Sequence, residues 1–364
     1  MTQATYTEVI SSLSRAALPL RELHGSGHVA VTTAAGRIIA LAFKRNGPNL
    51  LWSNPQLSDS ALTKNQPEKL VGGLGGDRLW FAPELEYHWH GVPQWDTLTN
   101  YKVPTAADPG AYTFNDAADN TIALQGTGAL QSTVNGHRVG FEITRTIRMP
   151  PSPLPANVAL QHQIHYAGIE TSHVLRFDSD TTLGRLDLWH LLQMPVGSVL
   201  IVPLKAGSSA ATQPPLSYAL SRGDWLQKPD KLLWRYGGTA GAKIGLSSRA
   251  LTGRTAVLQA LGTEEYCLIV RQFAVNENAP YADHPYGHPR TDQAFQAFDG
   301  MGFGEMEYHS PMLDAQSGPR ELRESDQLWA FGGSQTAMSA IAEQLLQTDL
   351  TDAFTLLGAD PCHS

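Results

Sequence analysis

Paired histidines and paired glutamates in two short segments are the strongest candidates for chemistry in this sequence. His88 and His90 stand two positions apart, and so do Glu305 and Glu307. Alternate side chains of an extended chain point to the same face, so each pair shares a face if its segment is a strand. Two imidazoles on one face suit proton transfer or metal binding. When two carboxyl groups lie close together on an interior face, the pKa of one of them rises, which suits a general base. A pair on an exposed face carries no function.

A glycine-rich segment, residues 72–84, is the next candidate. Four glycines in five residues permit backbone bends that other residues resist, and they precede Arg78. The segment lacks the Gly-Lys-Ser/Thr end of a phosphate loop. It is either a flexible turn before a strand or a cleft-lining loop in which Arg78 donates its planar fork to a substrate. Trp80 and Trp89 nearby can stack on sugar rings or pack in the core.

Single polar residues in two further segments complete the candidates. His190 lies among apolar residues in the segment 188–193, which ends at Gln193. Such a histidine is more often a hydrogen-bonded core residue, unless a cleft carboxylate is its partner. Tyr281 begins a polar, aromatic loop over 281–289, which is either the rim of a cleft or an ordered surface loop. Tyr87, next to His88, is a further candidate for substrate binding.

Several common catalytic signatures are missing from the sequence. It contains no Gly-x-Ser-x-Gly, no Gly-x-Gly-x-x-Gly after a strand and no His-Glu-x-x-His. Their absence argues against α/β-type hydrolases, dinucleotide enzymes and zincins. We expect no cofactor, apart from a divalent metal if the two pairs meet, with His88, His90, Glu305 and Glu307 as its ligands.

Composition and charge narrow the class of partner. The 364 residues are 42% hydrophobic and 16% charged, which favours a folded chain. The net charge of -8 and the lack of a basic run argue against nucleic acid and anionic membranes. The chain has two cysteines, Cys267 and Cys362, which form no disulfide framework or zinc-site spacing. The N-terminal residues do not resemble a signal peptide, so we expect a cytoplasmic protein.

The pattern of apolar residues predicts an all-β chain with a helix near each end. Apolar spacing over 5–18 and after Ser334 is helical, whereas Asn135-Gly136 between two alternating runs predicts a hairpin. We divide the chain into a helix and lead-in (1–22), a β-sandwich (23–335) and a C-terminal helix and tail (336–364). The predicted strands are 28–33, 37–43, 121–125, 130–134, 138–148, 159–166, 172–177, 184–194, 199–204, 232–236, 243–247, 255–261, 265–273, 304–309 and 326–331. Frequent short strands and turns favour a sandwich or barrel.

In chain order, these segments resemble a known family layout. The sequence is similar to uncharacterised families related to aldose 1-epimerase, within the galactose-mutarotase-like superfamily. The likeness runs roughly from residue 25 to 332 and depends on the order of short motifs. These are Gly-Arg-Ile-Ile at 36–39, Asn-Leu-Leu-Trp at 49–52, Gly-Asp-Arg-Leu-Trp-Phe-Ala-Pro at 76–83, Leu-Trp-His-Leu-Leu-Gln at 188–193 and Glu-Met-Glu-Tyr-His-Ser-Pro at 305–311.

The resemblance implies a β-supersandwich with a shallow cleft that binds a sugar. It places Glu307 as the base that takes the anomeric proton and His190 as the acid that protonates the ring oxygen. The early histidine of epimerases lies in an Asn-Gly-Leu-His-Gly-Gly-like stretch, which this sequence replaces with His88-Trp89-His90-Gly91. Glu305 is an additional carboxylate. An acid and a base at the anomeric centre each contribute about 10²–10⁴-fold in rate.

Three other functions remain open at this point. The same fold supports polysaccharide lyases, for which Arg78, Tyr87, His88 and His190 could neutralise a uronate and remove its proton. A metal-dependent sugar enzyme is the second, if the two paired segments meet. The third is a non-catalytic sugar-binding module, in which these side chains only hydrogen-bond hydroxyl groups.

Overall fold

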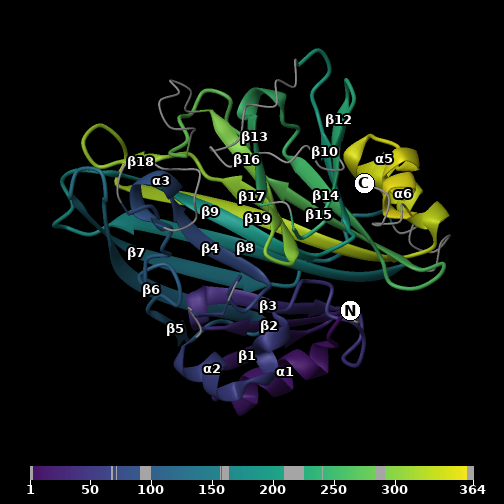
Figure 1. The fold of residues 1–364 in the computed structure, drawn as a ribbon, viewed down its shortest axis with the longest axis horizontal. Helices are drawn as coiled ribbons and strands as arrows, with labels where there is room; N and C mark the ends of the chain where they lie inside the picture. Colours follow the sequence, from purple (N-terminus) through teal and green to yellow (C-terminus); the bar gives the residue numbers. More distant parts are fainter. Residues whose placement is uncertain are drawn as a thin grey trace.

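Two large antiparallel sheets form the body of the protein. The computed structural model describes residues 3–66, 69–70, 72–90, 100–155, 157, 164–208, 225–239, 241–283 and 292–358. In this part of the chain, one sheet has nine strands and the other has ten. They run across the middle of Figure 1, with helices at both ends of the molecule. The predicted all-β sandwich with an N-terminal and a C-terminal helix is confirmed.

The nine-stranded sheet combines strands from the first, middle and last thirds of the chain. Its order is β1 (Leu20–His24), β2 (His28–Thr32), β3 (Arg37–Ala42), β4 (Asp77–Ala82), β9 (Arg185–Pro195), β17 (Phe303–His309), β16 (Gln293–Gly300) and β13 (Ala242–Ser247), with β18 (Leu313–Asp314) beside β9. The sequence predicted no strand between 265–273 and 304–309, but β16 lies there. Its alternating Phe295, Ala297 and Asp299 pair with β13 and β17 on either side.

The ten-stranded sheet contains the longer strands. Its order is β11 (Trp225–Gln227), β12 (Lys231–Arg235), β10 (Val199–Pro203), β14 (Arg254–Ala260), β15 (Tyr266–Phe273), β19 (Glu321–Gly333), β8 (His165–Phe177), β7 (Arg138–Arg148), β6 (Thr121–Gln131) and β5 (Tyr112–Asn115). The predicted hairpin joins β6 to β7, and Gly136 in its turn has a φ of 76°. The expected strand 172–177 is the end of the longer β8, whereas residues 159–163 lie outside the described part.

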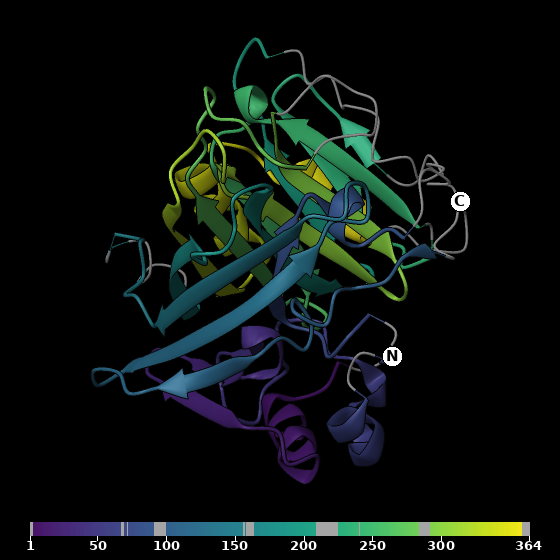
Figure 2. The same cartoon turned by 90° about the vertical axis from the view of Figure 1, so that its left-hand side faces the viewer.

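Helices cover the outer faces of the two sheets. Helix α1 (Tyr6–Arg15) packs on β3 beside α2 (Ser60–Asn65), and a capping box of Thr5 and Glu8 begins it. Helices α5 (Gln335–Leu346) and α6 (Thr351–Gly358) cover the ten-stranded sheet and share an apolar cluster with it. Figures 1 and 2 show the two helical groups on well-separated parts of the molecule.

The main apolar core fills the space between the sheets. It includes Leu79 and Phe81 from β4, and Ile143 and Leu175 from the opposing sheet, all of which are buried. Cys267 also belongs to this core and is free, whereas Cys362 lies outside the described residues. Among the described residues, no helix has the length and apolar character needed to cross a membrane.

Candidate active-site cleft

A cavity of about 450 Å³ lies over the middle of the nine-stranded sheet, on the face that points away from the other sheet. Its floor is formed by side chains at alternate positions of β4, β9, β17 and β13, including Arg78, Trp80, Trp189, Glu305 and Lys243. The strand registers explain why these residues meet. Because cross-strand partners point to the same face, the pairing of Arg78 with Leu191 and of Leu191 with Glu307 puts all three on the cavity face.

The glycine-rich segment forms one wall of the cavity, as the cleft-lining interpretation expects. Gly72, Gly73, Gly75 and Gly76 all have positive φ values between 72° and 102°. A Cβ on Gly75 would lie 2.4 Å from the carbonyl oxygen of Trp52, and one on Gly76 would lie 2.2 Å from that of Ile38. Only glycine therefore lets the segment turn this close to the neighbouring backbone before β4 begins.

Arg78 and Glu305 form a buried ion pair on the cavity floor. Arg78 Nη2 lies 2.6 Å from Glu305 Oε1, and each side chain is 6% exposed. The guanidinium also lies over Trp80, with Cζ 3.8 Å from the ring centroid. Its Nε is buried and has no hydrogen-bond partner among the described residues. The pair thus presents donor and acceptor atoms to a ligand in a fixed geometry.

A lysine between two carboxylates forms the second charged group, which we call the Lys243 cluster (Glu84, Lys243 and Glu307). Lys243 Nζ lies 2.9 Å from Glu84 Oε2 and 3.2 Å from Glu307 Oε2. Trp189 Nε1 donates to the same oxygen of Glu307 at 2.6 Å. Glu84 and Lys243 line the cavity, and Glu307 lies directly beneath them. The other oxygen of Glu307, Oε1, has no hydrogen-bond partner among the described residues.

The Lys243 cluster has one more carboxylate than it has positive charges. Burial raises the pKa of Glu307 to about 7, although Lys243 acts in the opposite direction. Burial also raises the pKa of Glu84. For Lys243, burial disfavours the charge, but the two carboxylates outweigh burial and raise its pKa above the ordinary value. Near neutral pH, the ammonium therefore stays charged while Glu307 can hold or release a proton, so the cluster offers both an acid and a base.

The pH dependence of the free energy of unfolding should reveal the raised pKa of Glu307. A carboxyl group whose pKa is about 7 when folded and near 4.5 when unfolded stabilises the fold below pH 4.5, and this contribution is lost as the pH rises through 7. We expect the unfolding free energy of the wild type, relative to Glu307→Gln, to fall by up to about 3 kcal/mol between pH 4.5 and 8. Urea unfolding at several pH values measures this difference. A difference that does not change with pH would contradict the raised pKa.

His88 lies behind the aromatic floor of the cleft, and His90 does not accompany it. The spacing of His88 and His90 puts them on one face only in a strand, but the residues just before them form a helical turn, α3 (Glu84–Tyr87). Pro83 and two early glutamates favour a helix start there. His88 is buried, 5.2 Å from the ring of Trp80, and burial lowers its pKa to about 3, so it is neutral. His90 is exposed and does not line the cavity.

His190 lies on the opposite face of β9 from the cavity. It pairs in register with Tyr308 and stacks on its ring at 4.1 Å, between the two sheets. Burial lowers its pKa to about 3, and its Nε2 contacts Glu324 Oε1. The structure therefore does not bring His190 and Glu307 together across one ligand. The four expected metal ligands are not gathered either: His88 is behind Trp80, His90 is exposed, and Glu305 and Glu307 hold separate cations.

The remaining sequence candidates support the cleft or lie apart from it. Gln193 is buried, and its Nε2 donates to Gly72 O at 2.9 Å, which anchors the glycine-rich wall. Tyr87 donates to Arg185 O, whereas Tyr281 hydrogen-bonds to the backbone of Asn276. Trp89 is buried against Tyr101. None of the three lines the cavity, and residues 284–289 of the predicted loop lie outside the described part.

Sequence reasoning missed three charged residues of the cleft. Lys243 stands alone in the apolar run of β13, and Glu84 follows the strand β4. Asp108 lines the cavity and holds Arg37 at 2.5 Å and Trp80 Nε1 at 3.3 Å. A single charge inside an apolar strand was the available signal for Lys243, since burying an ammonium is costly without a carboxylate partner.

His309 was also missed, and it lies beside the cleft floor. Its Nδ1 is 3.2 Å from Asp187 Oδ1, and its ring stacks on Trp189 at 5.8 Å. Burial disfavours the imidazolium, but Asp187 outweighs burial and raises its pKa. This pair supports Trp189 from below, which fixes the indole that donates to Glu307.

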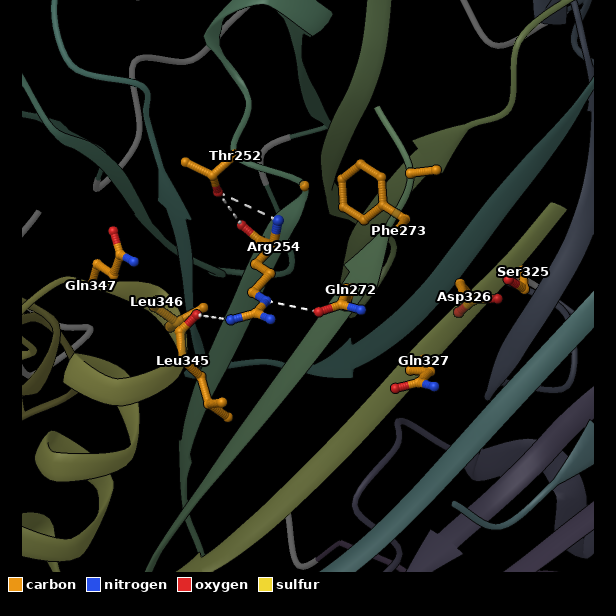
Figure 3. Close-up of a pocket in the computed structure, with 12 residues that line it drawn as sticks. Thr252, Arg254, Gln272, Phe273, Ser325, Asp326, Gln327, Leu345, Leu346 and Gln347 are labelled. Carbon is orange, nitrogen blue, oxygen red and sulfur yellow. Dashed lines mark hydrogen bonds between the residues drawn. The ribbon is translucent and has the colours of Figure 1, made fainter. Parts of the chain in front are cut away.

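A second cavity, of about 610 Å³, lies between the ten-stranded sheet and α5 (Figure 3). Arg254 crosses it, with Nε bonded to Gln272 Oε1 at 2.8 Å and Nη1 to Leu345 O at 2.7 Å. Asp326 is the single titratable acid among its described lining residues. The cavity therefore lacks the paired acid and base that the cleft offers.

Fold and site together define a two-sheet sandwich with an acid–base cluster in a cleft on one outer face. The chain belongs to DUF6786, a family of unknown function, whose model matches residues 4–356. No curated protein matched the sequence.

Solved structures of galactose mutarotase-like proteins are similar to this chain in fold. A galactose mutarotase-like protein from Lactobacillus casei is 10% identical, with a TM-score of 0.46 over 86% of this chain and 99% of its own. One from Clostridium acetobutylicum is 9% identical, with a TM-score of 0.46 over 86% and 98%. Galactose 1-epimerase from Lactobacillus acidophilus is 10% identical, with a TM-score of 0.45 over 87% and 95%. At such identities the likeness concerns the course of the chain and not its substrate or reaction.

Proposed function

We propose that the protein is a carbohydrate-active enzyme that interconverts the anomers of a small sugar bound in the cleft. The observation that carries this proposal is the Lys243 cluster. It places two carboxyl groups and one ammonium at the wall of a cavity, and burial raises the pKa of Glu307 to about 7. The cavity of about 450 Å³ is large enough for one small ligand.

Opening a sugar hemiacetal requires proton transfer at two neighbouring oxygens. The ionised Glu84 takes the proton from the anomeric hydroxyl, while the Lys243 ammonium gives a proton to the ring oxygen and regains one from the protonated Glu307. Both oxygens are bonded to the same carbon, so a carboxylate and an ammonium 2.9 Å apart can reach them from one side. After rotation about C1–C2, the ring closes on the other face, and the protons return to the cluster.

Glu84 is the carboxyl group that touches the substrate in this scheme, and Glu307 is its partner beneath. Glu84 and Lys243 line the cavity, whereas Glu307 is buried behind them and acts through Lys243. Trp80 and Trp189 offer aromatic faces to the C–H side of a sugar ring. The Arg78–Glu305 pair offers a donor and an acceptor to its hydroxyl groups.

Anomer exchange measured on freshly dissolved sugars tests the proposal. We expect saturable acceleration for at least one of a panel of neutral hexoses, sugar phosphates and uronic acids, followed by polarimetry or NMR exchange. Glu84→Gln should abolish most of the acceleration. Glu86→Gln is the matched control on the same helical turn, because Glu86 points toward Asn135 and not into the cluster. Sugar binding without acceleration would indicate a non-catalytic module, and neither binding nor acceleration would refute the proposal.

A lyase acting on a uronate is the second candidate, and cations at the cavity favour it. Lys69 and Lys102 line the cavity, are exposed and have no ion-pair partner among the described residues. Such lysines can attract and neutralise a carboxylate before a proton is removed next to it. Ultraviolet absorbance of an unsaturated uronate, formed from uronate oligosaccharides, would identify this reaction.

A further inference from the structure

A cluster of polar side chains lies between the two sheets, on the side of β9 that faces away from the cleft. Its histidines are His173 on β8 and His190 on β9, and its carboxylates are Glu324 and Asp326 on β19. One donor atom each from His173, His190 and Asp326 lies within 4.8 Å of the others. Glu324 Oε1 contacts His190 Nε2 and lies 3.5 Å from His173 Nδ1.

Three of the four histidine nitrogens in this cluster make no hydrogen bond with any described residue. They are both ring nitrogens of His173 and Nδ1 of His190, all of them buried. The His173 side chain is fully buried. Leaving a buried polar atom unpaired costs about 1–3 kcal/mol, so unpaired nitrogens on two adjacent imidazoles indicate a missing ligand. The two rings meet edge to face, with centroids 4.8 Å apart.

The charges around the cluster leave a carboxylate without a cation. Arg271 binds both Asp77 and Asp326, and Arg145 binds Asp77. Glu324 has no lysine or arginine partner within the described ranges, and it faces the two histidines. A cation placed between the imidazoles would therefore meet a donor set of two nitrogens and two carboxylate groups, which is a common set for first-row transition metals.

We propose that His173, His190, Glu324 and Asp326 bind one divalent transition-metal ion, such as Zn²⁺, that ties the two sheets together. The ligands come from β8 and β19 of one sheet and from β9 of the other. Tetrahedral Zn²⁺ holds its ligand atoms about 3.3 Å apart, so the ligand atoms of His173, His190 and Asp326 approach one another by up to about 1.5 Å on binding. The Glu324 side chain is 10% exposed, which gives the ion a path inward.

Metal analysis of the full chain without an affinity tag tests this site. We expect about one zinc per chain after growth with added zinc, removal by a chelator, and a rise in Tm of at least about 3 °C when Zn²⁺ is returned. Co²⁺ in place of Zn²⁺ should give the visible absorption bands of a four-coordinate site.

Variants locate the ion. His173→Gln and His190→Gln should each lower metal content at least about 10-fold and remove the Tm response, because each loses one of the ligands. His165→Gln is the matched control, since His165 is exposed on the same strand as His173. If a variant does not fold, the chelation and Zn²⁺ return of the wild type still decide the question.

Two outcomes would overturn the metal site. The first is a wild-type chain that holds less than about 0.1 metal per chain and shows no Tm change with Zn²⁺, which would leave buried water as the missing partner. The second is metal binding that survives both substitutions. Because the cluster lies on the other face of β9, neither outcome bears on the proposed chemistry of the cleft.

Discussion

Replacing Glu307 with glutamine is expected to lower kcat for anomer interconversion by about 10²–10⁴-fold. The amide keeps the shape of the side chain and can still accept the hydrogen bond from Trp189 Nε1, but it cannot exchange a proton with Glu84 through the Lys243 cluster. The wild-type rate should fall as the pH rises through about 7, because the cluster then loses the proton that the ring oxygen needs. Stopped-flow polarimetry across pH 5–9 measures both effects.

Glu305→Gln is the contrasting variant on the same strand. Glu305 binds Arg78 and does not belong to the Lys243 cluster, so its loss should raise KM several-fold more than it lowers kcat. A Glu307→Gln enzyme with the kcat and pH profile of the wild type would remove Glu307 from the proton transfer. Equal losses of kcat in the two variants would instead mean that both carboxylates act in the reaction.

Asp77→Asn is expected to destabilise the fold by about 3–5 kcal/mol, the largest stability effect that we anticipate. Asp77 is buried between the sheets, and its carboxylate lies 3.0 Å from Arg145 Nη2 and 3.0 Å from Arg271 Nη2. A neutral amide removes the negative charge that faces these two fully buried guanidinium groups. Urea unfolding followed by tryptophan fluorescence gives the change in the free energy of unfolding.

The exposed pair of Arg148 and Glu170 provides the control for this measurement. Arg148 is 61% exposed in that pair, so Glu170→Gln should cost less than about 1 kcal/mol. If Asp77→Asn costs no more than the control, the two arginines must find other partners, with Asp326 as the nearest carboxylate for Arg271.

Local patterns in the sequence were sufficient for much of the fold. Alternation predicted β2, β3 and β17, and Asn135-Gly136 predicted the β6–β7 hairpin, because turn chemistry and side-chain parity act within a few residues. Helix α3 and strand β16 were missed. Both are short or partly polar, and β16 becomes a strand by pairing with β13 and β17, which are distant in the sequence.

The register between paired strands decided which residues of different strands share a face, which the alternation along a single strand cannot show. The sequence placed Glu305 and Glu307 on one face of β17, and the structure puts that face in the cleft. It could not say whether His190 shares that face, because this depends on the pairing of His190 with Tyr308 and of Leu191 with Glu307. A register shifted by one residue would put His190 beside Glu307.

The sequence by itself determined the all-β class, the terminal helices and the two-residue spacing of the glutamates, since each follows from short-range backbone preferences. The tertiary structure alone decided that Lys243 lies between Glu84 and Glu307, because 159 residues separate Lys243 from Glu84. It also decided that His190 lies between the sheets and not in the cleft. Burial sets the pKa of these groups, and burial depends on the long-range packing of two sheets that no local pattern encodes.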